Sequence, residues 1–248
     1  MSHYKFDEKG NILPKDSPST AVFVQFPSVT TIISDCCDKS GPLCQWSANM
    51  VCEWIRQNCE HCITPECYIV SEEELNLARF EYKNVSQAAL NIGSAVHSGI
   101  ELYLKTGKDT WRKKNVCSKI ESGFVAFLEW MDKHHVEVMG VEETVIGNCW
   151  AGTRDLKAKI DSVVSVVDFK TSKAIYAAEY GPQIAAYRST DDDVEASFIL
   201  RLDKETGQPE WKDFSKRYES DLNIFNKMVK LYFAKHPIIR KKAGYKED

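Results

Sequence analysis

A predicted β-hairpin at residues 150–170 constrains the fold more than any other part of the chain. Its turn falls at residues 161–162, and an even-length loop there places Asp155 opposite Asp168 on the neighbouring strand. Because side chains alternate between the two faces of a strand, Lys170 shares a face with Asp168. The other face is apolar and consists of Leu156, Ala158, Ile160, Val163, Val167 and Phe169. We therefore expect one face to pack against a core and the other to present charged groups.

The facing carboxylates of Asp155 and Asp168 indicate a cation site. Like charges directly opposite each other on paired strands repel and destabilise the sheet. A divalent ion between the two carboxylates removes this penalty, and carboxylate oxygens are ligands that Mg²⁺ prefers. Together with the ammonium group of Lys170, these groups are what metal-assisted hydrolysis of a phosphodiester requires.

The order of the predicted elements indicates an α/β fold. It comprises two helices, three strands, a helix, a strand and a helix, at residues 86–104, 116–134, 136–146, 150–160, 163–170, 176–189, 195–203 and 216–235. This order predicts a mixed central sheet flanked by helices. We expect residues 1–85 to form a helical addition that packs on a core made by residues 86–248. In the addition, Ser71 and Glu74 form a capping box that starts a helix.

The bulk composition is that of a soluble globular protein. The chain of 248 residues is 43% hydrophobic and 27% charged, and it has no run of 18 or so apolar residues that could span a membrane. The N-terminus lacks the apolar core of a signal peptide, so we expect a cytoplasmic protein that does not bind membranes. The net charge of −4 argues weakly against a general nucleic-acid binder. It does not exclude a nuclease, because an acidic site lowers the charge until metal binds.

Nine cysteines allow two interpretations. In a cytoplasmic protein they are expected to be reduced thiols or metal ligands rather than disulfides. Cys59, Cys62 and Cys67, with His61 nearby, resemble a metal knuckle for Zn²⁺ or an iron–sulfur cluster. A fourth ligand would come from Cys36, Cys37, Cys44 or Cys52. The alternative, a loop with reduced thiols, is favoured because no complete ligand pattern is present.

Further candidate residues lie on the helix before the sheet and on its first strand. His97 and Glu101 are four positions apart and therefore share one face of their helix. A single histidine on a helix is more often structural or exposed than a ligand. Glu142 and Glu143 are neighbours in a strand, so their side chains point to opposite faces. Either both are surface and edge residues, or one of them supports the metal site.

The helix after the hairpin has an aromatic stripe that includes a glutamine. Gln183 and Tyr187 are four positions apart, and this spacing is more often core packing than a binding site. Gln183 nevertheless offers two donors and an acceptor towards the sheet, where it would orient Lys170 or a phosphate. Gly152, three residues before Asp155, is a strand glycine of the kind that marks a bulge or a close backbone approach.

Four short motifs in this order resemble the PD-(D/E)XK nuclease superfamily, in particular its RecB-like and phage-type exonuclease branch. They are Gly93…His97…Glu101, Gly152-Thr153-Arg154-Asp155, Asp168-Phe169-Lys170-Thr171 and Gln183…Tyr187. The match spans residues 93–187, and the segment at residues 26–30 resembles phage-type members more loosely. Each motif is common by itself, whereas four in order with compact spacing are specific. Asp168 stands where many members of the superfamily have glutamate.

The resemblance implies a role for each matched side chain. The implied metal ligands are His97, Asp155, Asp168 and the backbone carbonyl of Phe169. Lys170 would be the catalytic lysine, acting with the two aspartates, and Glu101 would assist beside His97. Gln183 and Tyr187 would shape the site and contact nucleic acid. Oxygen and imidazole ligands favour Mg²⁺ or Mn²⁺ over Zn²⁺.

The implied fold is that of restriction endonucleases, and the implied function is metal-dependent hydrolysis of DNA. Exonuclease action in DNA processing or recombination, of a phage or prophage type, is favoured. The chain lacks the phosphate-binding motif of a helicase motor. A nuclease without a motor acts alone, as a homo-oligomer or with a recombination partner protein, and the sequence does not choose among these. The alternative is a non-catalytic protein on the same fold that binds nucleic acid or assists assembly.

Overall fold

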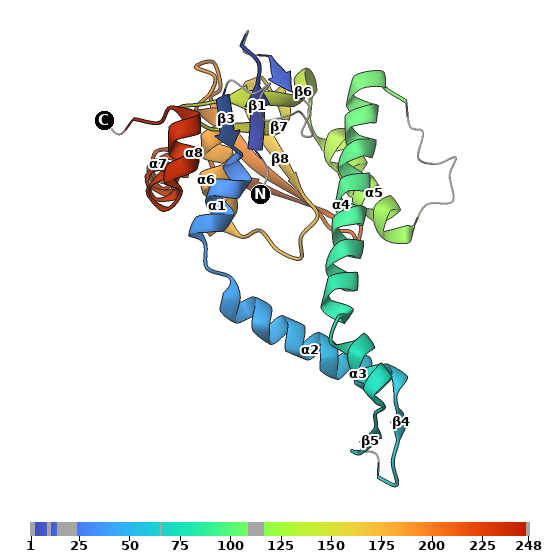
Figure 1. Ribbon diagram of the computed structural model, residues 1–248. Helices are drawn as coiled ribbons and strands as arrows, with labels where there is room; N and C mark the ends of the chain where they lie inside the picture. Colours follow the sequence, from blue (N-terminus) through green and yellow to red (C-terminus); the bar gives the residue numbers. More distant parts are fainter. Residues whose placement is uncertain (1–2, 9–10, 14–23, 65, 109–116, 247–248) are drawn as a thin grey trace. The chain divides into compact units, whose positions relative to one another are not determined.

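The computed structural model describes residues 3–8, 11–13, 24–64, 66–108 and 117–246. The chain forms two compact units, whose elements are labelled in Figure 1. The first unit comprises Met1–Cys37 and Val96–Asp248, and the second comprises Asp38–Ala95. This division differs from the expected one, which separated residues 1–85 from residues 86–248.

The beginning of the chain belongs with the sheet because it pairs and packs with it. Three short strands form an antiparallel sheet of order β2-β1-β3: β1 (His3–Phe6), β2 (Ile12–Leu13) and β3 (Val24–Pro27). Ser28 then makes a parallel bridge to Ala151 and caps helix α1 (Val29–Cys36). Val29 and Ile32 of this helix are fully buried in the core. The segment is therefore part of the main unit rather than of a helical addition.

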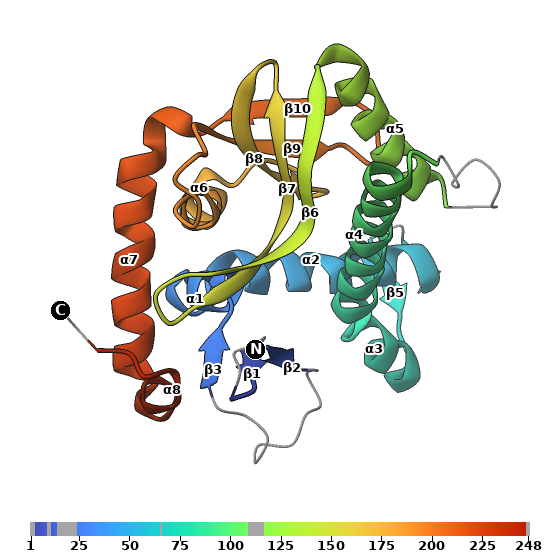
Figure 2. The same ribbon diagram turned by 90° about the horizontal axis from the view of Figure 1, so that it is seen from above.

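A mixed sheet is the centre of the main unit, as the element order predicted, and it has five strands where four were expected. Its spatial order is β10-β9-β8-β7-β6. The strands are β6 (Val136–Ile146), β7 (Ala151–Ile160), β8 (Val163–Lys170), β9 (Ala196–Leu202) and β10 (Pro209–Asp213). Only β8 and β9 run parallel, and the other neighbours are antiparallel. Figure 2 shows α5 (Ser118–Lys133) on one side of the sheet and α6 (Ala177–Arg188) and α7 (Tyr218–Lys235) on the other.

The predicted register of the β7–β8 hairpin is confirmed. Ile160 pairs with Val163, and the ladder continues to Leu156 opposite Val167. Both turn residues have positive φ, 48° at Asp161 and 78° at residue 162. A two-residue turn of this kind matches the right-handed twist of the strands it joins, so the register is determined locally.

Both faces of the hairpin are covered by a hydrophobic core. Leu156, Ala158, Ile160, Val167 and Phe169 are buried against α5 and residues 96–106 of α4, as expected for the apolar face. Val163 was expected there too but is 38% exposed, because pairing with β9 begins only two residues further on. The charged face also has a core, in which Val166 packs with α1, α6 and α7.

The second unit consists mainly of helices. Its elements are α2 (Ser40–Asn58), β4 (Glu60–His61), β5 (Tyr68–Ile69), α3 (Glu72–Ala78) and the first part of α4 (Glu81–Thr106). The capping box predicted at Ser71 and Glu74 is present, with both reciprocal hydrogen bonds. Residues 59–70, expected to be a loop, include the short β4–β5 ladder.

Two elements near the end of the chain were not predicted. Strand β10 is an edge strand rich in charged residues, so it lacks the apolar pattern by which a buried strand is recognised. Helix α8 (Pro237–Ala243) has seven residues, too few for a clear helical period. No helix among the described parts of the chain is long and apolar enough to cross a membrane.

Candidate metal centre

Three acidic or imidazole side chains from different elements converge at the sheet. One ligand atom each of His97 (α4), Glu142 (β6) and Asp155 (β7) lie within 4.8 Å of one another. Among the residues that the structure describes, this is the one group of three or more such side chains close enough to hold a metal ion. The Nδ1 atom of His97 lies 3.7 Å from the Oδ2 atom of Asp155.

A distortion of β6 brings Glu142 to the site. The β6–β7 register shifts between Val138 and Gly140, and Glu142 has a positive φ of 53°. Its neighbours Val141 and Glu143 remain paired with β7, so Glu142 lies across from Asp155. The sequence left open whether either glutamate supports the metal site. A glycine two residues earlier in the strand was a signal for this bulge.

Glu143 has a different role. Its Oε2 atom accepts a hydrogen bond of 2.8 Å from Arg154, whose other terminal nitrogen contacts Asp191 at 2.5 Å. The Arg154 side chain is only 4% exposed. Glu143 therefore neutralises a buried arginine next to the site and leaves Glu142 as the ligand candidate.

The two strands of the hairpin separate where the site begins. The backbone ladder between β7 and β8 ends at Leu156 and Val167. One residue further, the Oδ2 atom of Asp155 accepts a hydrogen bond of 2.7 Å from the backbone N–H of Phe169. The carboxylate thus replaces a ladder bond and holds the strand ends together. The role of the Phe169 carbonyl as a ligand stays a prediction.

Asp168 is bound to its own neighbours rather than to the group of three. Its Oδ2 atom lies 2.6 Å from the Nζ atom of Lys170, and its Oδ1 atom accepts a hydrogen bond of 2.9 Å from Gln183. Lys170 in turn donates to Gln183 at 3.1 Å and lies 4.8 Å from the centre of the Tyr180 ring. The predicted link between Gln183 and Lys170 is confirmed. The expected sharing of one ion by Asp155 and Asp168 is not visible in these contacts.

Tyr187 and Gly152 pack against each other behind this cluster. Gln183 donates to the Tyr187 hydroxyl at 3.3 Å, and both side chains are buried. A Cβ atom at Gly152 would lie 2.6 Å from the Tyr187 ring and 3.2 Å from Val29. The close backbone approach predicted for this glycine is therefore confirmed, and it connects two of the four sequence motifs.

Glu101 lies outside the group. Its carboxylate is half-exposed and contacts Lys105 at 2.6 Å, an ordinary pair four positions apart on a helix. One helical turn separates it from His97, so its charge reaches the site only at a distance, where it contributes to the raised pKa of Glu142. The expected helper role beside His97 has no contact that supports it.

The acidic groups of the site are crowded and buried. Burial and the charge of Asp168 raise the pKa of Asp155 to about 8. Burial and the charge of Asp155 raise the pKa of Glu142 to about 7. Burial lowers the pKa of His97. Burial would also lower the pKa of Lys170, but the carboxylates of Asp168 and Asp155 outweigh it and raise the pKa. The imidazole is neutral and the carboxyl groups are closely spaced. A divalent cation would therefore bind the imidazole and relieve the repulsion between the carboxylates.

The site opens into a pocket of about 390 Å³. His97, Asp155, Asp168, Lys170, Gln183 and Tyr187 line it. The start of the chain supplies the opposite wall through residues of β1, β2 and the first turn of α1. Tyr4 of β1 is tied to β7 by a hydrogen bond of 2.9 Å to Thr153. The sequence analysis expected residues 1–85 to pack on the core as helices, and it did not identify the strands β1 and β2 that contribute to this wall.

The cysteines give no comparable cluster. Cys59 is buried, whereas Cys62 and Cys67 are exposed on the β4–β5 hairpin. Their ligand atoms do not form a group of the compactness seen at His97, within the described part of the chain. All nine cysteines are free thiols in the structure. The buried thiol of Cys59 faces Glu74, and desolvation raises its pKa.

Comparison with known proteins does not extend these observations: no protein-family model and no curated protein sequence matches the chain.

Proposed function

We propose that this protein is a divalent-metal-dependent DNA nuclease with a restriction-endonuclease-like core. One observation supports the proposal most directly. Two of the three side chains that could hold an ion, His97 and Asp155, line the same pocket as Lys170, a largely buried lysine. Asp168 and Gln183 set the position of this lysine. This combination of ligands and ammonium group is the one that phosphodiester hydrolysis needs. The resemblance of the four sequence motifs to PD-(D/E)XK nucleases points to the same chemistry.

The donor atoms fit Mg²⁺ or Mn²⁺. His97, Glu142 and Asp155 would hold the ion, with two hard carboxylates and one imidazole. The pKa values of both carboxyl groups are raised because burial and neighbouring carboxylates disfavour their ionised forms, and a bound cation would favour those forms. When bound, the metal would lower the pKa of a coordinated water and neutralise charge on the phosphate.

The protein's own groups would position and stabilise the phosphate. Lys170 is held on one side by Asp168 and on the other by Gln183, so its ammonium group has little freedom. An ammonium group fixed in a largely buried site stabilises the negative charge that develops on a phosphate oxygen. Asp168 could coordinate the ion only if its contacts with Lys170 and Gln183 were broken. In this arrangement it acts as a positioning residue for Lys170.

End-labelled single- and double-stranded DNA with Mg²⁺ or Mn²⁺ tests the proposal. Wild-type protein should cleave, and Lys170→Ala should lose cleavage by about 100-fold or more, the scale for removing one charge-stabilising group. Lys173→Ala is the matched control, because this lysine is exposed and lies three positions further along the chain. Lys170→Met, which keeps most of the side-chain volume, serves if the alanine variant unfolds. Undiminished cleavage by both Lys170 variants would reject the mechanism.

The same digestion distinguishes the alternative function. A non-catalytic protein on this fold would retain DNA without cutting it under any divalent metal. The order of product lengths would show whether an active enzyme is an exonuclease, as the motif resemblance implies. That resemblance also suggests a phage-type recombination setting, with a partner protein or a homo-oligomer, and pull-down with recombination proteins and measurement of the mass in solution would test it.

A further inference from the structure

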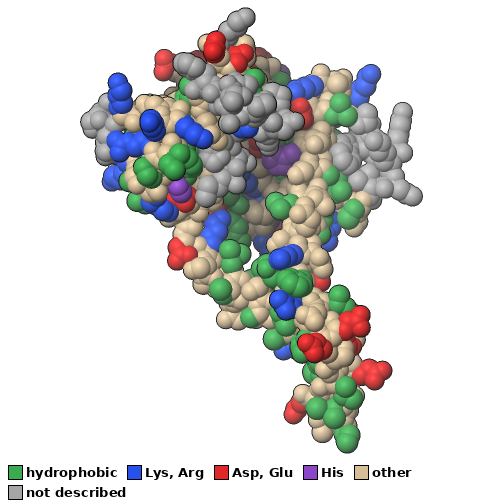
Figure 3. All heavy atoms as spheres, viewed as in Figure 1, with side chains coloured by type: hydrophobic (Ala, Val, Ile, Leu, Met, Phe, Trp, Pro, Cys, Tyr) green, Lys and Arg blue, Asp and Glu red, His purple; other side chains and the backbone are tan. Residues whose placement is uncertain are grey.

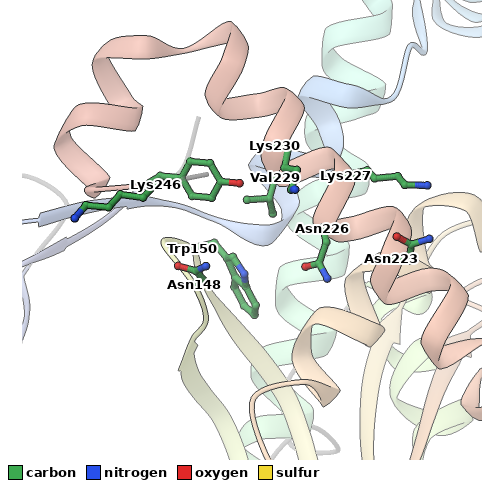
Figure 4. A pocket seen from close by; sticks show the side chains of 9 residues that line it. Asn148, Trp150, Asn223, Asn226, Lys227, Val229, Lys230 and Lys246 are labelled. Carbon is green, nitrogen blue, oxygen red and sulfur yellow. The ribbon is translucent and has the colours of Figure 1, made fainter. Parts of the chain in front are cut away.

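A second pocket, of about 420 Å³, lies between the β6–β7 turn, α7 and the C-terminal segment (Figure 4). We call it the basic pocket. Its polar lining consists of Lys227, Lys230, Lys246, Asn148, Asn223 and Asn226. No acidic side chain is among the described residues that line it. It is therefore a concave site with three positive charges in a protein whose net charge is −4.

The lysines of the basic pocket differ from the lysines that form ion pairs elsewhere in the molecule. Lys105, Lys119, Lys133, Lys157, Lys170 and Lys235 each contact a carboxylate within 3.2 Å. Within the parts of the chain that the structure describes, Lys227, Lys230 and Lys246 make no ion pair. Their ammonium groups are exposed and available to an anion.

The wall of the pocket is preorganised by a tight turn. The N–H of Gly147 donates to the carbonyl of Trp150 at 2.9 Å, and Cys149 adopts a positive φ of 62°. Trp150 is 4% exposed and packs edge-on against Phe225 at 5.3 Å. A Cβ atom at Gly147 would overlap the Trp150 ring, so the turn requires glycine there. The ring therefore forms a fixed floor beneath the polar groups.

Helix α7 presents its polar groups on one stripe. Asn223, Lys227 and Lys230 follow one another at spacings of four and three positions, so they share a face of the helix. Asn226 lies on the adjacent row. Figure 3 shows that Lys and Arg side chains gather over α7 and α8. Positively charged side chains are thus grouped at these two helices.

We propose that the basic pocket binds the sugar–phosphate backbone of a DNA strand outside the metal centre. This inference rests on the proposed nuclease function. Lysine ammonium groups neutralise phosphates, and asparagine amides offer both donors and acceptors to phosphate, sugar and base edges. An acidic peptide would be neutralised by the lysines as well, but it offers fewer groups for three amides. A nucleic-acid strand fits the mixed lining better.

The position of the basic pocket would allow a DNA strand bound at the metal centre to continue into it. Trp150 lines the basic pocket, and Gly152, two residues further on, lines the pocket of His97 and Asp155. Two residues of extended chain span about 7 Å. The two pockets are therefore neighbours along the start of β7, and one strand of DNA could contact both.

Binding of a fluorescein-labelled single-stranded oligonucleotide in EDTA tests the inference without any cleavage. Fluorescence anisotropy of the full chain gives the affinity at a series of salt concentrations. A variant with Lys227→Ala, Lys230→Ala and Lys246→Ala should bind at least about tenfold more weakly, and the slope of log affinity against log salt should become shallower by about 2. A variant with Lys204→Ala, Lys212→Ala and Lys216→Ala has the same change in charge and should behave as the wild type. Circular dichroism verifies that both variants are folded.

The outcomes separate this inference from the proposed function. Unchanged affinity and salt slope in the pocket variant would overturn the inference, even if the wild type cleaves DNA. Weaker binding by the pocket variant would support it, even if the wild type proves to be inactive with every metal. If polyglutamate binds the wild type but not the pocket variant, while both bind the oligonucleotide equally, the ligand is an acidic polypeptide and the inference is wrong.

Discussion

Gly152 and Tyr187 are packed so closely that a Cβ atom at the glycine would lie 2.6 Å from the tyrosine ring. The ring lies where it does because β7 has no side chain at that position. Tyr187 accepts a hydrogen bond from Gln183, which in turn holds both Asp168 and Lys170. The absence of one methyl group in a strand therefore affects the position of the lysine across a chain of three contacts.

Gly152→Ala tests this relationship. The added methyl group overpacks a buried contact, so the free energy of unfolding should fall by about 1–3 kcal/mol. The displaced ring should also disturb Gln183 and lower nuclease activity more than the loss of folded protein explains. Urea titration and cleavage rates measure the two effects. Gly41→Ala is the control, because nothing lies within 4 Å of its Cβ position in a helix, where alanine is the better residue. Equal stability of the Gly152→Ala protein and the wild type would contradict the packing argument.

Gln183→Leu distinguishes a role of Gln183 in orienting Lys170 from a role in binding DNA. The change removes the hydrogen bonds to Asp168 and from Lys170 but keeps a side chain of similar size. Loss of such an outer contact typically costs about 10–100-fold in activity. We expect the loss in kcat, with KM for DNA nearly unchanged, because the lysine is present but poorly oriented. A rise in KM at constant kcat would instead show that Gln183 contributes to substrate binding alone.

Asp155→Asn tests the charge crowding. The asparagine oxygen can still accept the N–H of Phe169, but it has no charge to be repelled by Asp168 or penalised by burial. The metal-free variant should be more stable than the wild type at neutral pH by roughly 1–4 kcal/mol. It should also lose the stabilisation by Mg²⁺ or Mn²⁺, measured by thermal unfolding. Asp192→Asn is a suitable control, because this aspartate is exposed and lies in the turn before β9. If Asp155→Asn were less stable than the wild type at neutral pH, charge repulsion and burial at Asp155 would not be destabilising.

The raised pKa values predict a pH dependence of metal binding. In the folded, metal-free protein, Glu142 has a pKa of about 7 and Asp155 of about 8, whereas unfolded carboxyls titrate near 4. Between about pH 4 and pH 8 the folded state holds more protons, so these two groups make the metal-free protein less stable as the pH rises. Metal must displace the protons, so its affinity should increase from about pH 6 to pH 8.

Calorimetric titration with Mn²⁺ at several pH values measures this dependence, and proton release should be detected in buffers of different ionisation enthalpy. The metal-induced rise in Tm should be larger at pH 8 than at pH 6. The control is His97→Ala combined with Glu142→Gln, which removes two of the three candidate ligands. An affinity that is constant over this range would show that the carboxyl groups are already ionised at neutral pH.

Local pattern was sufficient to predict most of the sheet. The alternation of residues 150–170 and a two-residue turn determined the register that places Leu156 opposite Val167. The predicted face of the apolar residues follows from the same period and is confirmed except at Val163. These features depend on neighbours in sequence, so they can be derived without knowledge of the rest of the chain.

The composition of the candidate metal centre could not be derived in this way. Which of Glu142 and Glu143 turns inward depends on a bulge in β6, and the partner of Asp168 depends on how α6 packs over the sheet. The wall made by the start of the chain depends on the bridge between Ser28 and Ala151, residues far apart in sequence.

By itself, the sequence determined the order of the elements, the register of the central hairpin and the residue types gathered near it. Only the tertiary structure decided which carboxylate joins His97 and Asp155, and which is engaged by Lys170. The physical reason is the sequence separation over which the interactions act. Strand periodicity and turn geometry act over a few residues, whereas the choice between a metal ligand and an ion pair is made by helices and strands that meet only in the folded protein.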